Sequence, residues 1–355
     1  MHIPDGYLSP ASCAAMVAAS APFWYVALQR VQRTLTARLA PLLSVCAAFS
    51  FVVMMFNLPL PGGTTGHAVG MCVTTVVLGP WASILSLSVA LMIQAVFFGD
   101  GGITAFGANC FNMAVVGSLV SHVVYRTVSG RSPITSPRRV LAAALGGYVA
   151  INAAALLAGI EFGLQPALFH DSSGAPLYAP YPLAIAVPAM MLGHLTLAGF
   201  AEGILSAGVV AWLQHSDAAL LKLNEPSPLY GWRLTRPFWI GVAGLTLAAP
   251  LGLLASGTAW GEWGVADFSK PEARQEMATA SHNVAPPENA PGGLQRLASV
   301  WKAPIPDYAP PFMKSPPFGY LLSAMMGVGL AIAASLFLHG IARATKRRDA
   351  APPAL

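Results

Sequence analysis

The first two residues, Met1 and His2, bring together three nitrogens that can bind one metal ion. Methionine aminopeptidase generally spares Met1 when the next side chain is as large as histidine, so Met1 keeps a free amine once it is deformylated. The terminal amine, the amide nitrogen of His2 and its imidazole can then close two fused chelate rings, leaving one planar position open. This chemistry requires Met1 to be the true terminus. The alternative is that His2 is an interfacial polar residue at a frayed chain end.

A second histidine, His67, closes the glycine-rich segment from Gly62 to Gly66. An apolar run starts at His67, so we expect a helix to begin there and the imidazole to point from its N-terminus into the protein. His67 could supply the fourth nitrogen. Four nitrogens in a plane suit Ni(II) or Cu(II), whereas Mg, Ca and Mn prefer oxygen and Zn prefers a tetrahedron. The alternative is a glycine-rich turn before a helix, with no ligand in it.

A third polar group contains Asp100, Asn109 and Asn112, close to several glycines at the end of an apolar run. Irregular backbone at membrane depth is tolerated only where it is buried in protein or lines a cavity. These three side chains could therefore hold the ligating imidazoles in one tautomer through hydrogen bonds. The alternative is an outward turn whose glycines serve helix packing.

His194 and Glu202 lie within one apolar run, where polar groups cost free energy unless they face partners. Eight positions on a helix advance roughly 80° around its axis, so both side chains can face the protein interior. We interpret them as buried packing or coupling residues and not as metal ligands.

The elements that position these residues follow from composition. Of the 355 residues, 55% are hydrophobic and only 9% are charged, and the mean hydropathy is +0.61. Soluble proteins carry about 25% charged residues, so a water-soluble enzyme, a nucleic-acid-binding domain and a disordered chain are excluded. The chain is predicted to be an all-α polytopic membrane protein in a lipid bilayer. Nine apolar runs are predicted to cross the membrane: 10–29, 40–58, 66–79, 82–98, 104–125, 140–160, 182–210, 238–256 and 319–341.

The basic residues predict the orientation, because lysine and arginine concentrate in cytoplasmic connections. With the N-terminus outside, 14 of the 19 basic residues fall on the inward side, and an odd number of helices places the C-terminus in the cytoplasm. The net charge of +5 is therefore a topology signal and no indication of nucleic acid. The inward residues are Arg30, Arg33, Arg38, Arg126, Arg131, Arg138, Arg139, Lys222, Arg233, Arg236, Arg343, Lys346, Arg347 and Arg348.

Residues 257–318 hold ten prolines, six acidic and five basic residues, which predicts an extended, weakly structured linker outside the membrane. This linker divides the chain into a seven-helix unit, residues 1–236, and an appended helix-loop-helix unit, residues 237–355. The N-terminus has neither a basic n-region nor an A-x-A site, so we expect no cleavable signal peptide.

Two motifs are absent from the sequence. None of the five lysines follows a glycine, so there is no G-x-x-x-x-G-K-[ST] motif and we expect no ATP site in this chain. There is also no H-E-x-x-H, which removes the commonest intramembrane metalloprotease interpretation.

Together, the N-terminal segment from Met1 to Ser9, the segment 62–67 and the segment 98–113 resemble the CbiM/NikM family. Its members are substrate-binding membrane components (S components) of energy-coupling-factor transporters for cobalt and nickel. The resemblance covers residues 1 to about 225. It implies that the metal is held by the terminal amine of Met1, the nitrogens of His2, and His67.

The appended unit resembles the small CbiN/NikN accessory subunit, fused here in one chain as in NikMN. That likeness is architectural, with Trp260-Gly261-Glu262-Trp263 and Pro306-Asp307-Tyr308 in the loop between its two spans. The resemblance implies a transmembrane coupling (T) protein and cytoplasmic ATPase subunits as partners, in a bacterial inner membrane. We also expect the 257–318 loop to lie over the outward face and to help the metal reach the N-terminal site.

The sequence thus predicts the metal-capture subunit of an ATP-driven importer, with Ni(II) as the first choice of substrate. A Co(II) importer component for cobalamin synthesis is the close alternative. A stand-alone secondary permease or channel would need an ion relay across the bilayer, yet His194 and Glu202 are nearly the only such groups inside. A membrane enzyme or metal sensor would need an open catalytic position or a signalling domain, and the sequence offers neither. We therefore expect a transport subunit and not an enzyme.

Overall fold

The computed structural model describes residues 1–34, 39–221 and 232–349, so Arg38 and Lys222 lie outside the described residues. The described chain is mostly helical, and seven of its helical segments are long and apolar enough to cross a membrane, as expected for a multi-pass membrane protein. These segments are Pro10–Gln32, Pro80–Phe98, Phe106–Ser129, Pro137–Leu168, Leu183–Ser216, Thr235–Leu254 and Pro316–Leu338.

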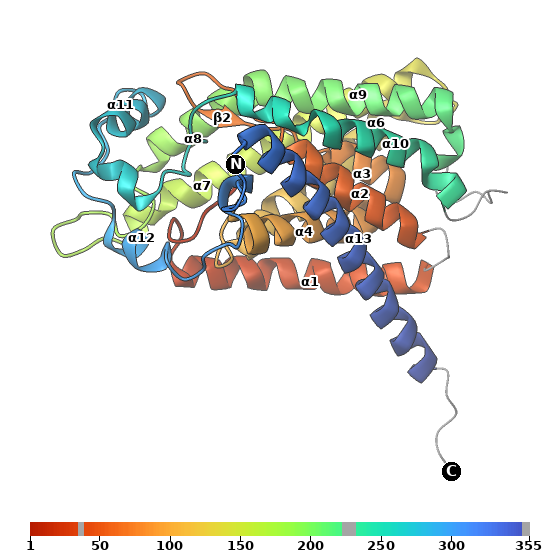
Figure 1. Cartoon of the computed structure of the whole chain (residues 1–355), viewed down its shortest axis with the longest axis horizontal. Helices are drawn as coiled ribbons and strands as arrows, with labels where there is room; N and C mark the ends of the chain where they lie inside the picture. The colour runs from red at the N-terminus through yellow and green to blue at the C-terminus, as the bar shows by residue number, and fades with distance from the viewer. Residues whose placement is uncertain (35–38, 222–231, 350–355) are drawn as a thin grey trace, which may run out of the picture.

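The central and peripheral helices differ sharply in burial. The segment Pro80–Phe98 is 78% buried inside the protein, whereas Pro10–Gln32 is only 17% buried. The first is therefore the core of the bundle, and the second lies on its outside (Figure 1). The helices from the N-terminus to the middle of the chain are α1 (Pro10–Thr34), α2 (Leu39–Met54), α3 (Met71–Leu78), α4 (Pro80–Ile93), η1 (Gln94–Phe98), α5 (Phe106–Asn109), η2 (Cys110–Val116), α6 (Gly117–Ser129) and α7 (Pro137–Leu168).

Two of the nine predicted spans are shorter in the structure than the sequence suggests. The described part of α2 has 16 residues, and α3 has eight. Eight helical residues rise about 12 Å, far less than the hydrocarbon core of about 30 Å, so α3 does not cross on its own. Gly79, with φ of 76°, separates α3 from α4, and its conformation provides the break that the Gly-Pro sequence predicts.

The predicted helix start at His67 is wrong. A short antiparallel ribbon forms instead, pairing β1 (Leu58–Pro59) with β2 (Thr65–Gly66), and α3 begins only at Met71. Gly70 lies in the left-handed region with φ of 79°, so the backbone turns there before the helix starts. His67 is therefore a loop residue four positions before the helix.

Three of the long segments contain a π-helical turn. These turns are η1, which continues α4; η2, between α5 and α6; and η3 (His194–Ala198), between α8 (Leu183–Gly193) and α9 (Gly199–Ser216). Such turns occur frequently at functional sites. The remaining helical elements are η4 (Ala218–Leu221), α10 (Trp232–Ala248), η5 (Ala249–Leu254), η6 (Val265–Ser269), α11 (Pro271–Ala280), α12 (Gly292–Leu297), η7 (Pro306–Tyr308) and α13 (Pro316–Asp349).

The prediction of an extended linker over 257–318 is also wrong. This segment folds into η6, α11, α12 and η7, and it buries Trp263, Phe268 and Met277 almost completely. Its aromatic and apolar side chains supply a small core that the proline count conceals. Figure 1 shows α11 and α12 at one end of the bundle, and α13 running from near the N-terminus toward the opposite end.

The last helix packs directly on the first unit. Gly327 of α13 lies so close to Phe51 of α2 that a Cβ there would be 1.9 Å from the ring. The Tyr320 hydroxyl donates to the carbonyl of Met55 at 2.6 Å. The two units predicted from the sequence are thus packed into one body.

Candidate metal centre

The N-terminal segment is inserted into the protein and not frayed. The exposed fraction of Met1 is 3% and that of His2 is 1%. Asn109 clamps the next residue, because its Oδ1 accepts from the Ile3 amide at 2.8 Å and its Nδ2 donates to the Ile3 carbonyl at 3.0 Å. The Gly102 amide donates to the same carbonyl at 2.8 Å. These bonds fix the backbone on which the terminal amine and the His2 imidazole are carried.

At two positions beside this segment, neighbouring atoms come so close to the backbone that only glycine fits. A Cβ on Gly102 would lie 2.4 Å from the Asp5 amide, and a Cβ on Gly6 would lie 2.9 Å from the Leu294 backbone. Asp5 in turn accepts from the amides of Ile103 and Thr104 at 3.2 and 2.7 Å. The terminal segment is thereby wedged between the 101–104 loop and the 257–318 segment.

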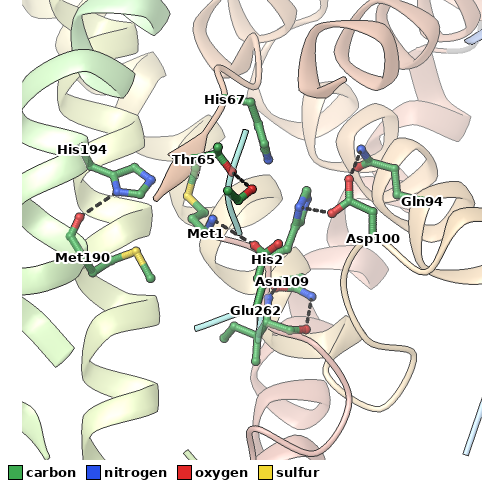
Figure 2. Close-up of polar contacts among 12 residues, drawn as sticks. Met1, His2, Thr65, His67, Gln94, Asp100, Asn109, Met190, His194 and Glu262 are labelled. Carbon is green, nitrogen blue, oxygen red and sulfur yellow. Dashed lines mark hydrogen bonds and ion pairs between the residues drawn. The ribbon is translucent and has the colours of Figure 1, made fainter. Parts of the chain in front are cut away.

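His2 and His67 lie side by side, with ring centroids 4.9 Å apart and ring planes at 34° (Figure 2). His67 Nδ1 contacts the carbonyl of Ala68 at 3.0 Å. A carbonyl only accepts, so Nδ1 carries the proton and Nε2 carries the lone pair. Burial, then the nearby charges of His2 and the Met1 ammonium, lower the pKa of His67 to about 3. His67 is therefore a neutral imidazole that can bind a metal without losing a proton.

Asp100 holds the other imidazole. Its Oδ1 lies 2.7 Å from His2 Nδ1, and its Oδ2 accepts hydrogen bonds from the Tyr308 hydroxyl and from Gln94 Nε2, the latter at 3.1 Å. Burial opposes the ionisation of Asp100, but the charge and hydrogen bond of His2, with the charge of His67 and the Tyr308 bond, hold its pKa well below the usual range. Asp100 is a fixed negative charge beside the two histidines.

A second carboxylate faces the terminal amine. The Met1 ammonium lies 3.5 Å from Glu262 Oε1, which belongs to the 257–318 segment. Burial raises the pKa of Glu262, against the opposing effect of the Met1 charge. The appended unit therefore contributes Glu262 to the amine and Tyr308 to Asp100, and both contacts lie at the centre of the site.

Glu202 of α9 holds the loop that carries His67. Its Oε2 accepts from the amides of Val69 and Gly70 at 2.7 and 2.9 Å, just before α3 begins. These amides would otherwise be unpaired donors at a buried helix start, which costs free energy. Glu202 is fully buried, as its predicted interior orientation requires.

Of the remaining residues predicted for the site, Asn109 and Asn112 have contacts other than those expected from the sequence. Asn109 binds the backbone of Ile3 and does not hold an imidazole, whereas Asn112 Nδ2 donates to Glu161 on α7 at 3.0 Å. His194 is 3% exposed and faces the interior. Sequence reasoning did not assign Glu262, Tyr308 or Gln94 to the site. The signal for the first two was the pair of aromatic and acidic motifs in the 257–318 loop.

The comparisons with known proteins identify metal transport proteins as relatives of this chain. The family described as "Cobalt uptake substrate-specific transmembrane region" matches residues 2–220, and the PDGLE domain matches residues 236–344. The fused nickel transport protein NikMN of Rhodobacter capsulatus is 56% identical over 98% of this chain and 99% of that protein. The probable fused nickel transport protein LarMN of Lactiplantibacillus plantarum is 43% identical over 92% and 94%, respectively. A crystal structure of a transition metal transporter is 51% identical, covers 60% of this chain and 92% of that one, and has a TM-score of 0.57.

Proposed function

The chain belongs to the CbiM family of cobalt uptake transmembrane proteins, and we propose that it captures Ni(II) from outside the cell for uptake. The observation that carries this proposal is the convergence of Met1, His2 and His67 in a buried site, with the two imidazoles 4.9 Å apart. The burial of Met1 and His2 and the proximity of the two imidazoles support a shared ion at this place. In this proposal the metal is the transported substrate of the protein and not a resident cofactor.

The ligands in this proposal are four nitrogens. The terminal amine and the His2 amide nitrogen close a five-membered ring, and the His2 amide and Nδ1 close a six-membered ring; Nε2 of the same imidazole is too remote to do so. His67 Nε2 takes the fourth position. The ion replaces the proton of the amide and one proton of the ammonium. It also displaces the His2 Nδ1 proton that faces Asp100, and this proton moves to Nε2 of the same ring, so two protons are released in all.

Nickel is preferred to cobalt on the chemistry of the donor set. Four nitrogens in a plane stabilise low-spin d8 Ni(II). The most similar relatives described above are named as fused nickel transport proteins. Cobalt is the alternative, because other members of the family are named cobalt transport proteins.

We further propose that the chain is an S component of an energy-coupling-factor importer, driven by ATP hydrolysis in separate subunits. In this proposal the energy comes from partners, a transmembrane coupling protein and cytoplasmic ATPase subunits, which agrees with the absence of a P-loop motif from the sequence. Uptake of radioactive nickel by cells with and without the ATPase subunits tests this. Uptake that continues without them would favour a stand-alone permease.

The two units divide the work in this proposal. Residues 1–236 bind the metal, and residues 237–355 form an accessory unit whose folded 257–318 segment lies over the site. Glu262 and Tyr308 support this role, because they contact the terminal amine and Asp100 directly. With the N-terminus outside and the C-terminus in the cytoplasm of a bacterial inner membrane, this segment faces the side from which the ion arrives.

One insertion tests the site. A residue inserted between Met1 and His2 moves the amine out of the chelate, so calorimetry should show loss of tight Ni(II) binding and the visible absorption of a planar site should disappear. A residue inserted in the exposed turn at Ser173 is the matched control and should change neither. The proposed chelate is wrong if both the affinity and the spectrum survive the first insertion or the change His67→Ala.

A further inference from the structure

A buried histidine outside the proposed ligand set, His194, has one nitrogen without a partner. Its Nδ1 contacts the carbonyl of Met190 at 2.8 Å, one helical turn earlier, so Nδ1 carries the proton. Its Nε2 is inaccessible to solvent and has no hydrogen-bond partner within the part of the chain that the structure describes. The lone pair of Nε2 is therefore held in place and unused.

This arrangement has the form of a metal ligand. An unpaired buried acceptor costs free energy, so its presence requires a reason. Histidines that bind metals almost always donate their other ring N–H to a carbonyl or carboxylate, which fixes the tautomer and the ring orientation. The Met190 carbonyl does this for His194, as the Ala68 carbonyl does for His67.

His194 faces the terminal site. Figure 2 shows its ring between Met190 and Met1, with the unpartnered nitrogen on the side of Met1. The metal proposed to bind at Met1 would therefore lie on the same side as this lone pair.

The backbone next to His194 is linked by side-chain packing to the loop that carries His67. The side chain of Leu60 fits between two glycines, since a Cβ on Gly193 would lie 2.8 Å from Leu60 Cδ1 and a Cβ on Gly66 would lie 2.7 Å from the same atom. His194 also begins the π turn η3, in which Thr196 has non-helical φ and ψ. Leu60 therefore couples the start of this turn to the loop that carries His67.

Resting on the proposed function, we propose that His194 is the ligand that receives Ni(II) when the ion leaves the terminal chelate toward the interior. Planar d8 ions exchange ligands through attack by an incoming donor from above the plane, so release requires a free lone pair beside the bound ion. His194 Nε2 supplies that lone pair. His67 cannot take this role, because it is already a ligand in the plane.

The exchange balances without any further reagent than water. A bond from Ni(II) to His194 Nε2 forms as a bond to the terminal dipeptide breaks. When the bonds to the amide nitrogen and to the amine have both broken, each nitrogen takes a proton from one water molecule, and the two waters leave as two hydroxide ions. His194 neither gains nor loses a proton, because its Nδ1–H remains on the Met190 carbonyl.

The change His194→Asn distinguishes the roles of the two ring nitrogens. The asparagine amide can still donate to the Met190 carbonyl, but it places no donor at the position of Nε2. The purified variant should bind Ni(II) with unchanged affinity and an unchanged planar absorption spectrum. Uptake of radioactive nickel by cells that contain the complete transporter should fall by about tenfold or more. The matched control is His170→Asn, because His170 is exposed and its Nδ1 also contacts a carbonyl, that of Asp171, at 3.1 Å.

Two outcomes would overturn the proposal. Uptake equal to that of the unchanged protein would show that no ion passes through His194. Loss of equilibrium binding together with uptake would show that His194 maintains the ground-state site. A separate measurement tests the chelate itself. If the His67→Ala variant still binds Ni(II) as the unchanged protein does, the proposed chelate is wrong, whatever the His194→Asn variant shows.

Discussion

Asp100 Oδ1 lies 2.7 Å from His2 Nδ1, the imidazole nitrogen that the proposed chelate needs for the ion. The carboxylate therefore positions His2 before the metal arrives and must give up this contact when the metal binds. Glu262 stands in the same relation to the Met1 amine. Each of these two ligand nitrogens is thus held by a carboxylate, and the two negative charges also favour a dication between them.

The first prediction concerns Asp100. In the Asp100→Asn variant the negative charge beside the ion is lost while the size of the side chain is kept. We expect the affinity for Ni(II), measured by calorimetry, to fall about 10- to 100-fold. Asp171→Asn, in an exposed turn, is the control and should bind as tightly as the unchanged protein. Equal affinities for the two variants would show that Asp100 does not support the metal.

The second prediction concerns protons. Binding through a terminal amine and a backbone amide should release about two protons per ion, so the affinity should rise with pH. His67 should contribute none between about pH 5 and 8, because its pKa is lowered to about 3 and it is already neutral there. Calorimetry in buffers of different ionisation enthalpy counts the protons. A count near zero would contradict coordination by the amide.

The third prediction concerns the accessory unit. Glu262→Gln removes the charge that faces the Met1 ammonium but leaves the folded 257–318 segment intact. We expect weaker Ni(II) binding, by about tenfold, because a nearby negative charge is lost. Glu288→Gln, an exposed change in the same segment, should have no effect and serves as the control. If both variants bind alike, the 257–318 segment acts on the metal site through its shape alone.

The fourth prediction concerns Glu202. Glu202→Ala leaves the Val69 and Gly70 amides without their acceptor, so we expect a loss of about 2 kcal/mol in the free energy of unfolding. The His67 loop should also loosen and Ni(II) binding should weaken. Glu202→Gln keeps an acceptor oxygen and should lose much less of both. Thermal unfolding in detergent and calorimetry measure the two effects, and similar losses in both variants would count against the hydrogen bonds.

The proposed ligand residues can be identified from the sequence because their chemistry is local. A terminal amine, an amide and an imidazole are adjacent in Met1 and His2 wherever the chain goes. The start of α3 was not predictable in the same way. It depends on a left-handed Gly70 and on Glu202, whose oxygen reaches the Val69 amide across 133 residues of sequence.

The prediction of an extended linker over 257–318 was wrong for a similar reason. Proline content favours an extended chain, but the burial of Trp263, Phe268 and Met277 depends on the surface that the helix bundle provides. An acidic residue in such a segment, like Glu262, resembles any solvated glutamate until its partner is known. Residues that meet through tertiary contacts of this kind carry little signal in one sequence.

The packing of Gly327 against Phe51 has a consequence for how the protein is produced. Because α13 packs on α2 and the 257–318 segment carries Glu262 to the terminal amine, the proposed site takes groups from both units. Separate polypeptides would have to find one another in the bilayer at cellular concentrations. A single chain fixes their stoichiometry at one to one and keeps them at an effective concentration on the order of millimolar, so every translated copy carries its own accessory unit.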